Sequence, residues 1–168
     1  PYRCAYCHQT MGKTFRKRSP ESVVAEMVAL RFTHGFKEFE ILDDCFNLDR
    51  QRTHEILTGI QKRIGDARLH FPNAVRSDIL EPDDMRLFKK AGTVTLCFAI
   101  ETASPRLQKM VHKNLDIEKA SRAIEAAVKE GIYSTGYFMI GFPTETYQEA
   151  QSTVRFAARS SLHRALFF

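Results

Sequence analysis

The chain has 168 residues, 43% of them hydrophobic, which is enough to bury the core of one domain. A net charge of +5 permits an anionic partner without requiring one, because dispersed lysines and arginines are usually just solvated. Four cysteines are too few for a disulfide scaffold, and no apolar run reaches the ~18 residues that a membrane span needs.

The first half of the chain predicts two helices around a short strand. Ser19-Pro20-Glu21 is typical of a helix start, with a capping serine, a proline at the first position and an acid in the first turn. Apolar residues follow at helical spacing until Gly35. Phe36 to Leu42 is predicted as a strand, and Asp49 as the cap of a second helix that ends at Gly65.

The second half continues the alternation of strands and helices. Val94 to Ile100 is almost uniformly apolar, as in a strand buried on both faces, and Ser104-Pro105 opens a short helical piece. Further strands are predicted over 69–75, 132–140 and from 166, and further helices over 82–90, 116–131 and 147–159. Such alternation with short connections is typical of repeated βαβ units on a parallel sheet.

This alternation fits two architectures, a doubly wound open sheet and a complete or partial barrel. In barrel enzymes the chemistry gathers at the carboxyl ends of the strands. Polar or small residues follow each predicted strand here, and we expect them to converge on one rim with Cys4 and Cys7. They are Asp43, Asp44, Arg76, Asp78, Glu101, Thr102, Gly141 and Glu145.

The stretch Cys4-Ala5-Tyr6-Cys7-His8 offers a pair of thiols that can hold one metal centre, and thiolates select zinc, copper or iron-sulfur clusters. Taken literally, Cys-x-x-Cys-His is the signature of covalent haem attachment. The pair is also half of a zinc site, which needs a second pair at similar spacing. Cys45 and Cys97 stand alone, so the chain supplies neither the setting of a haem-attachment site nor a second ligand pair for zinc.

A third interpretation comes from the residues before the pair. Pro1 to Cys7 resembles the end of Cys-x-x-x-Cys-x-aromatic-Cys, the loop of the radical S-adenosylmethionine (radical SAM) superfamily, whose first cysteine would lie one residue before Pro1. The resemblance implies a 4Fe-4S cluster held by three thiolates, with S-adenosylmethionine chelating the fourth iron. It also implies that this chain, with two of the three ligands, binds its cluster poorly.

Three later stretches carry the same resemblance: Ile41 to Phe46, Ala99 to Ser104 and Met139 to Glu145. They are similar to the segments after strands two, four and five in the branch of cobalamin-binding radical SAM enzymes, methylthiotransferases and coproporphyrinogen oxidases. Arg18 to Val24, with the Asp-Asp pair, most resembles the cobalamin-binding group. The implied fold is α/β, a partial (β/α)₆ TIM-like barrel that lacks strand 1 and is truncated in strand 6. Residues 1–168 would form this single domain, with flanking domains outside the chain.

The resemblance also implies roles for single residues near the cluster. Cys4 and Cys7 would ligate iron, and Tyr6 would lie beside the adenine. Asp43 and Asp44 stand where the family commonly has Gly-Gly-Glu, which receives the methionine amino group, and Asp44 is the favoured partner. The alternative is structural, because an aspartate here can cap the next helix.

The remaining roles fall on the later strand ends. Glu101 would accept hydrogen bonds from the ribose hydroxyls or the methionine amine, which makes it, with Asp44, a catalytic candidate. Arg76 would pair with the methionine carboxylate, or else form a salt bridge to Asp78 or Glu81. The Ile140-Gly141 turn would pass close to adenine, and Thr144 stands where relatives often have glycine. Cys45 and Cys97 are predicted to be ordinary buried cysteines.

The implied activity is reductive cleavage of S-adenosylmethionine to a 5′-deoxyadenosyl radical that abstracts hydrogen from an organic substrate. A methyltransferase or oxidoreductase would result, with cobalamin-dependent methyl transfer as one form and the cobalamin bound outside this chain. Such an enzyme needs an electron donor such as flavodoxin or ferredoxin, and its oxygen sensitivity suggests the cytoplasm. An RNA-modifying radical enzyme and a non-catalytic metal or haem module remain alternatives.

Overall fold

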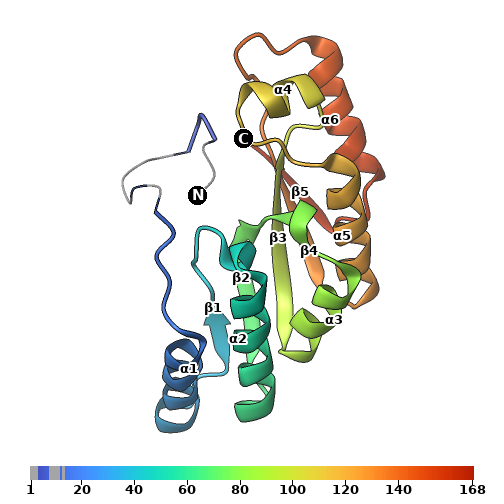
Figure 1. Cartoon of the computed structure of the whole chain (residues 1–168). Coiled ribbons are helices and arrows are strands. Elements are labelled where there is room, and N and C mark those ends of the chain that lie inside the picture. The colour runs from blue at the N-terminus through green and yellow to red at the C-terminus, as the bar shows by residue number, and fades with distance from the viewer. Residues whose placement is uncertain (1–3, 8–11, 13) are drawn as a thin grey trace.

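The computed structural model describes residues 4–7, 12 and 14–168 of the chain. Its centre is a parallel sheet of five strands that lie side by side in the order of the sequence (Figure 1). The strands are β1 (Glu38–Glu40), β2 (Arg68–Val75), β3 (Thr93–Glu101), β4 (Tyr133–Phe138) and β5 (Arg164–Phe167).

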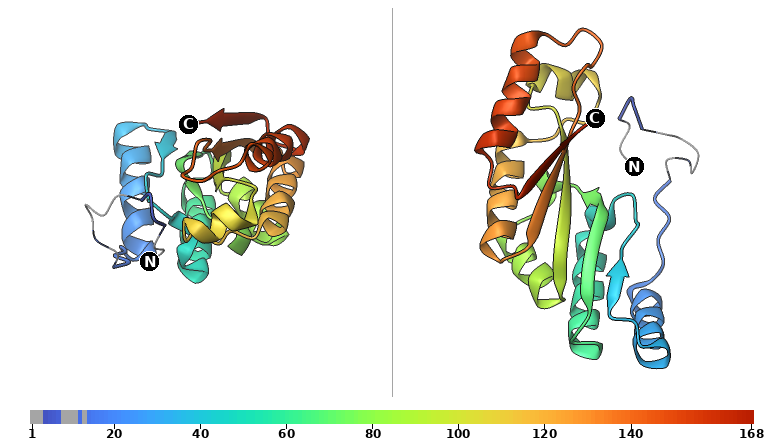
Figure 2. Two further views of the ribbon diagram at one scale, coloured as in Figure 1. Left: turned by 90° about the horizontal axis from the view of Figure 1, so that it is seen from above. Right: turned by 180° about the vertical axis from the view of Figure 1, so that it is seen from behind.

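Helices connect the strands and form an outer layer around the curved sheet (Figure 2). They are α1 (Pro20–His34), α2 (Arg50–Arg63), α3 (Pro82–Lys90), α4 (Pro105–Met110), α5 (Ile117–Lys129) and α6 (Tyr147–Arg159), with 3₁₀ turns η1 (Phe46–Leu48) and η2 (Ser77–Ile79). A doubly wound sheet reverses its strand order at a switch point, and this sheet does not. The predicted partial barrel is therefore confirmed, with β1 to β5 in the places of strands two to six.

The two faces of the sheet differ because successive side chains alternate. On the outer face, Leu69 and Phe71 of β2 and Leu96 of β3 are fully buried in the core against the helices. On the inner face, neighbouring strands are joined by polar contacts: His70 Nδ1 lies 3.0 Å from Thr95 Oγ1 on β3. The concave side of the arc thus carries polar contacts between strands, whereas the convex side packs into the hydrophobic core.

Two irregularities in strand pairing lie near the carboxyl ends of the strands. Between β2 and β3 the register shifts from Phe71 opposite Leu96 to Val75 opposite Phe98, and Ala74 has φ of 72°. Between β3 and β4 the register shifts before Glu101. Bulges of this kind bend a strand and re-aim its side chains. They occur here at the edge where the candidate site lies.

Helix starts follow the sequence closely, whereas strand ends do not. Ser19, Asp49 and Ser104 cap α1, α2 and α4, each accepting a hydrogen bond from a backbone N–H of the first turn, as predicted. The strand predicted over 36–42 is shorter, because β1 is an edge strand that pairs only with β2. The strand predicted over 132–140 likewise ends at 138, where the ladder with β5 ends.

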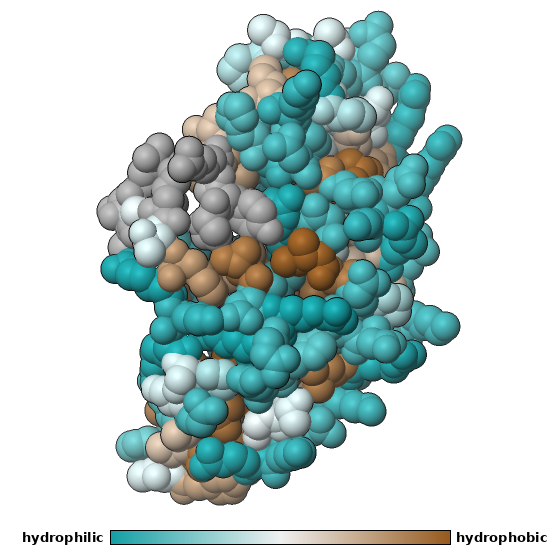
Figure 3. Space-filling model, in the orientation of Figure 1, coloured by the Kyte–Doolittle hydropathy of each residue, from teal (hydrophilic) through white to brown (hydrophobic). Residues whose placement is uncertain are grey.

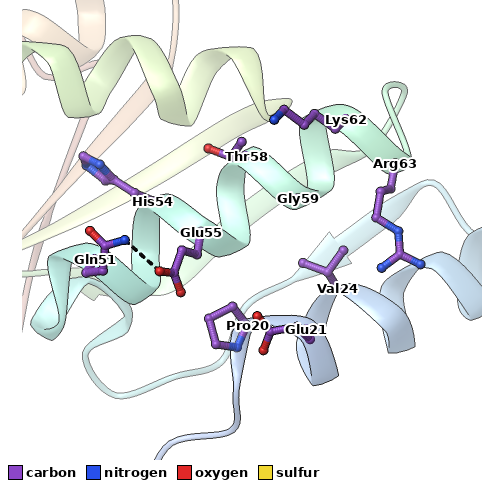
Figure 4. Close-up of a pocket in the computed structure, with 10 residues that line it drawn as sticks. All are labelled: Pro20, Glu21, Val24, Gln51, His54, Glu55, Thr58, Gly59, Lys62 and Arg63. Carbon is purple, nitrogen blue, oxygen red and sulfur yellow. Dashed lines mark hydrogen bonds between the residues drawn. The ribbon is translucent and has the colours of Figure 1, made fainter.

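Most of the surface seen in the orientation of Figure 1 is hydrophilic, and apolar side chains appear on it in separate places (Figure 3). Among the described residues, no helix has the length and apolar character needed to cross a membrane. A groove of about 530 Å³ lies between α1 and α2 (Figure 4). These helices approach closely because Gly59 has no side chain: a Cβ there would lie 2.7 Å from Cγ2 of Val24.

Gly92 gives a test of the packing between the turn that joins α3 to β3 and the residue before β2. Its φ is 97°, and a Cβ on it would lie 1.9 Å from the carbonyl oxygen of Ala67. We expect Gly92→Ala to lower the free energy of unfolding by at least about 3 kcal/mol in urea denaturation, because the backbone must move. The control is Gly35→Ala, with φ of 77° and open space around it, which should cost about 1–2 kcal/mol. Equal losses in the two variants would contradict the close approach.

Candidate functional site

The cysteine loop is docked onto the segment that follows α4. The N–H of Ala5 donates to the carbonyl of Val111 at 2.9 Å, and the N–H of Cys7 donates to the carbonyl of Cys4 at 3.2 Å, which closes a tight turn. Cys4 is buried and Cys7 is exposed, and both are free thiols. Because α4 follows β3, the loop lies at the carboxyl edge of the sheet, as predicted.

The two thiols are close enough to affect each other's ionisation. Although Cys7 is exposed, the surrounding loop shields its thiol from water in part, and this desolvation raises the pKa of Cys7 most; the neighbouring Cys4 raises it further, and the Lys113 ammonium opposes both effects. Two adjacent thiolates therefore carry an electrostatic penalty in this pocket. A coordinated metal removes such a penalty, because a metal-bound thiol is deprotonated outright. The pair fits the chemistry of a soft-metal or iron-sulfur centre.

The described part of the chain holds no group of three or more His, Cys, Asp or Glu side chains placed to hold a metal ion. The role of Cys4 and Cys7 as metal ligands therefore stays a prediction. The predicted zinc alternative needs a second ligand pair, which these residues do not provide. His8, on which the haem alternative depends, lies outside the described residues.

Glu101, the last residue of β3, forms a buried ion pair with Lys113. The Lys113 Nζ lies 2.9 Å from Glu101 Oε1, and the two residues are 9% and 8% exposed. Glu101 has φ of 68°, in the left-handed region, so the strand end is strained. A buried carboxylate needs a partner, so the sequence indicated that Glu101 has one. The sequence did not show which lysine it is.

Lys113 is turned inward by its neighbours. His112 and Asn114 have φ of 55° and 50°, so the lysine sits between two residues in the left-handed conformation. Asparagine tolerates this conformation better than most residues. The short irregular loop between α4 and α5 therefore places the Lys113 ammonium near the cysteine loop.

Tyr6 connects the cysteine loop to two of the predicted site segments. Its ring centroid lies 6.3 Å from that of Phe142, which follows Gly141. The pKa of the phenol is raised, first by burial and then by the negative charge of Glu101. The structure thus brings Cys4, Cys7, Tyr6, Glu101 and the Ile140-Gly141 turn together, as the sequence analysis expected.

The turn after β4 is fixed by a carboxylate. Oε2 of Glu145 accepts hydrogen bonds from the N–H groups of Gly141 at 2.5 Å and Phe142 at 3.3 Å. Gly141 and Thr144 have φ of 92° and 64°. The positive φ explains why glycine suits the place of Thr144. Arg106 supports the strained threonine by donating to its carbonyl at 2.8 Å.

Asp43 and Asp44 lie in the exposed loop after β1, at the same edge of the sheet. Neither one starts α2, which Asp49 caps, so the structural alternative for the pair is wrong. Oδ1 of Asp43 lies 3.9 Å from Nη1 of Arg52 on α2. Contact of Asp43 or Asp44 with a ligand stays a prediction.

Arg76 follows β2 and forms the salt bridge that the sequence analysis named as its alternative role. Its Nε and Nη2 donate to the two carboxylate oxygens of Asp78 at 2.8 and 3.0 Å. The same guanidinium lies 3.4 Å from the carbonyl of Asn114, beside Lys113. Its contact with a ligand carboxylate stays a prediction. The guanidinium that would make this contact is already bound by Asp78.

Cys45 and Cys97 were predicted to be ordinary buried cysteines, and the structure confirms this for Cys97. Its Sγ lies 3.2 Å from the Tyr137 hydroxyl on the inner face of the sheet. Cys45 is only partly buried, because it precedes η1 in the loop after β1. Burial raises the pKa of its thiol, and the charge of Arg76 opposes this.

Fold and site together define a partial β/α barrel with a pair of free thiols and a buried ion pair at the carboxyl ends of its strands. The model of the radical SAM superfamily matches residues 1–157 of the chain. The chain therefore belongs to the radical SAM superfamily.

Relatives within that superfamily include methyltransferases. The chain is 32% identical over 169 residues to an uncharacterized methyltransferase of Pyrococcus horikoshii, covering 99% of the chain and 36% of the relative. It is 29% identical over 174 residues to cytidylyl-2-hydroxyethylphosphonate methyltransferase of Streptomyces wedmorensis, and the match covers 98% of the chain and 32% of that enzyme. The chain also superimposes on the radical S-adenosylmethionine methyltransferase TsrM of Kitasatospora setae, which was solved with cobalamin and a [4Fe-4S] cluster. The TM-score is 0.87 at 21% identity, and the match covers 99% of the chain and 34% of TsrM. The chain spans about a third of the length of these proteins.

The ion pair between Glu101 and Lys113 can be tested by stability. We expect Lys113→Met to lower the free energy of unfolding by about 3 kcal/mol at neutral pH, because it leaves a buried carboxylate unpaired. Glu101→Gln in the same chain should recover part of the loss. Lys119→Met, at an exposed position, is the control and should change stability by less than about 0.5 kcal/mol in urea denaturation. A loss no larger than this in Lys113→Met would contradict the buried pair.

The carboxylate of Glu149 on α6 links α6 to α4, next to the turn at Thr144. Arg106 donates to it at 2.8 and 2.7 Å, and Ser104 at 2.6 Å. The Arg106 hydrogen bonds, followed by that of Ser104, hold the pKa of Glu149 far below its ordinary value of 4.5.

A group with a lowered folded pKa stabilises the protein above its unfolded pKa, and this contribution is lost as the pH falls. We expect the melting temperature of the wild type to fall more steeply below about pH 5 than that of Glu149→Gln. Glu118→Gln, at an exposed position of α5, serves as the matched control and should follow the wild type. Parallel curves for wild type and Glu149→Gln would refute the assignment.

Proposed function

We propose that this chain is the S-adenosylmethionine-binding core of a radical SAM methyltransferase that uses cobalamin. The observation that carries the proposal is the docking of the Cys4–Cys7 loop beside the Glu101–Lys113 pair at the carboxyl edge of the sheet. The methyltransferase names of the relatives and the likeness to TsrM support the same class.

The donor set of the site fits the groups that the family uses. Cys4 and Cys7 would supply two thiolates to the 4Fe-4S cluster, and Tyr6 would cover one side of the adenine. Glu101 would accept hydrogen bonds from the ribose or the amino group, and Asp44, with Asp43, would meet the amino group from the loop after β1. When bound, the cluster and S-adenosylmethionine supply reductive cleavage of a carbon-sulfur bond and a radical that takes hydrogen from the substrate.

The protein residues contribute binding, orientation and charge. The backbone of Ile140 and Gly141 would lie against adenine, held in place by the Glu145 carboxylate. Two cations are candidates for the methionine carboxylate, one of which Asp78 already binds. Arg76 is one, and Lys113 is the other, because its ammonium uses one N–H on Glu101 and has two more. Both lie at the edge that carries the cysteine loop.

The partners follow from this chemistry. The full-length protein would use an electron donor such as flavodoxin or ferredoxin, an organic substrate, and cobalamin held by a part of the protein outside the present chain. The length of the relatives, about three times that of the chain, supports a separate cobalamin-binding part. Oxygen sensitivity of the cluster favours the cytoplasm. No contact or surface feature of the described residues favours RNA over a small substrate.

The proposal is tested on the full-length protein, including whatever precedes Pro1, purified without oxygen. We expect about four irons per chain and release of 5′-deoxyadenosine from S-adenosylmethionine after reduction. Cys4→Ser and Cys7→Ser should lose most of the iron, because each removes a thiolate. Cys45→Ser, at a partly buried cysteine outside the loop, is the matched control and should keep it.

Two results would contradict the proposal. Stoichiometric zinc, or a haem absorption band, in place of iron and sulfide would show that the loop holds another metal centre. Methyl transfer that continues after removal of cobalamin would keep the radical SAM core but refute the use of cobalamin.

A further inference from the structure

Gln108 on α4 joins two separate backbone segments through one buried side chain. It is 3% exposed. Its Nε2 donates to the carbonyls of Ile100 at 2.8 Å and Thr102 at 2.7 Å, and its Oε1 accepts from the N–H of Leu115 at 3.1 Å. All three of these hydrogen bonds join the amide to backbone groups.

The two segments are those that carry the buried ion pair. Glu101 stands between the two carbonyls that receive the amide protons, and Lys113 lies two residues before Leu115. The backbone carbonyl of Gln108 also accepts the N–H groups of Lys113 and Asn114, both at 3.1 Å. One residue therefore contacts the backbone on both sides of the pair.

Both segments need such support because both are strained. Glu101 has φ of 68°, and Lys113 is flanked by two residues with positive φ. Conformations of this kind persist only where the surrounding structure fixes them. An amide is suited to the task, since it offers donors and an acceptor on one rigid group. A hydrocarbon of the same size would leave the Thr102 carbonyl and the Leu115 N–H without this partner, which is costly in a buried place.

We infer that Gln108 is a positioning residue, which sets the separation of the Glu101 carboxylate and the Lys113 ammonium and so their ability to meet S-adenosylmethionine together. This inference rests on the proposed function, because that proposal gives the two charged groups their ligand. Gln108 itself does not touch the reacting atoms. Its effect on binding must therefore pass through Glu101 and Lys113.

The test measures the Kd of S-adenosylmethionine by equilibrium dialysis with the full-length, cluster-loaded protein. We expect Gln108→Leu to weaken binding about tenfold, because three buried hydrogen bonds are lost and the charged pair is displaced. Its iron content should equal that of the wild type, since the contact between Ala5 and Val111 is untouched. Ile124→Val, which lowers stability from the buried face of α5 without touching the site, is the control and should bind normally.

A double-mutant cycle separates positioning from a general loss of stability. If Gln108 acts through the pair, adding Gln108→Leu to a protein that already carries both Glu101→Gln and Lys113→Met should weaken binding less than about threefold. The same cycle is run with Gln108→Asn, which keeps an amide one methylene shorter, if the leucine variant does not fold.

The outcomes distinguish the two proposals. Failure of the wild-type protein to bind S-adenosylmethionine would overturn the proposed function and this inference with it. Normal binding by the wild type, together with unchanged binding in Gln108→Leu or full additivity in the cycle, would overturn the role of Gln108 alone.

Discussion

Parallel pairing of consecutive strands is the constraint on which the site depends. Each strand of this sheet must run in the same direction as its neighbours, so every carboxyl end faces one edge. The connections that follow β1, β2, β3 and β4 then share that edge, although they are far apart in the sequence. The described part of the cysteine loop is joined to this edge by the backbone hydrogen bond from Ala5 to Val111 and by the ring contact between Tyr6 and Phe142. A site made of segments from five places is a consequence of strand direction, and no long-range motif is needed to assemble it.

The edge is also where the backbone departs from ideal geometry. Ala74, Glu101 and Thr144 all have positive φ, and two register shifts lie close to them. Polar side chains from the helical layer hold two of these departures: the amide of Gln108 holds the end of β3, and Arg106 holds the carbonyl of Thr144. The core beneath is mostly apolar. Strain is thus concentrated where ligand groups must be aimed, and polar contacts from α4 stabilise it.

Much of this structure could be predicted from the sequence, for identifiable reasons. The helix caps at Ser19 and Asp49 are local chemistry, and the apolar run in β3 reports burial directly. The cysteine loop and Glu101 were found because their residue types are unusual at such places. The predicted ends of the strands were less accurate, because a strand ends where its pairing with the neighbouring strand ends.

Other features depend on contacts between residues far apart in the sequence. No pattern in the sequence links Lys113 to Glu101 across an irregular loop, or Glu149 to Arg106 across two helices. The partner of Arg76 could not be predicted for the same reason. Both a ligand and Asp78 offer it a carboxylate, and the bidentate geometry with Asp78 appears only in three dimensions. Long side chains with several candidate partners are therefore the residues for which structure adds most.

The two edges of the open sheet differ in their tendency to pair with other strands. β1 carries the charged side chains of Glu38, which is paired with Arg68 on β2, and Glu40, and charged side chains on an edge strand discourage a further strand from adding to it. β5 ends at Phe167, and Phe168 follows it; their side chains are 44% and 71% exposed. An apolar strand edge is a template for edge-to-edge association. Of the two edges, β5 is therefore the one more open to pairing with a further strand.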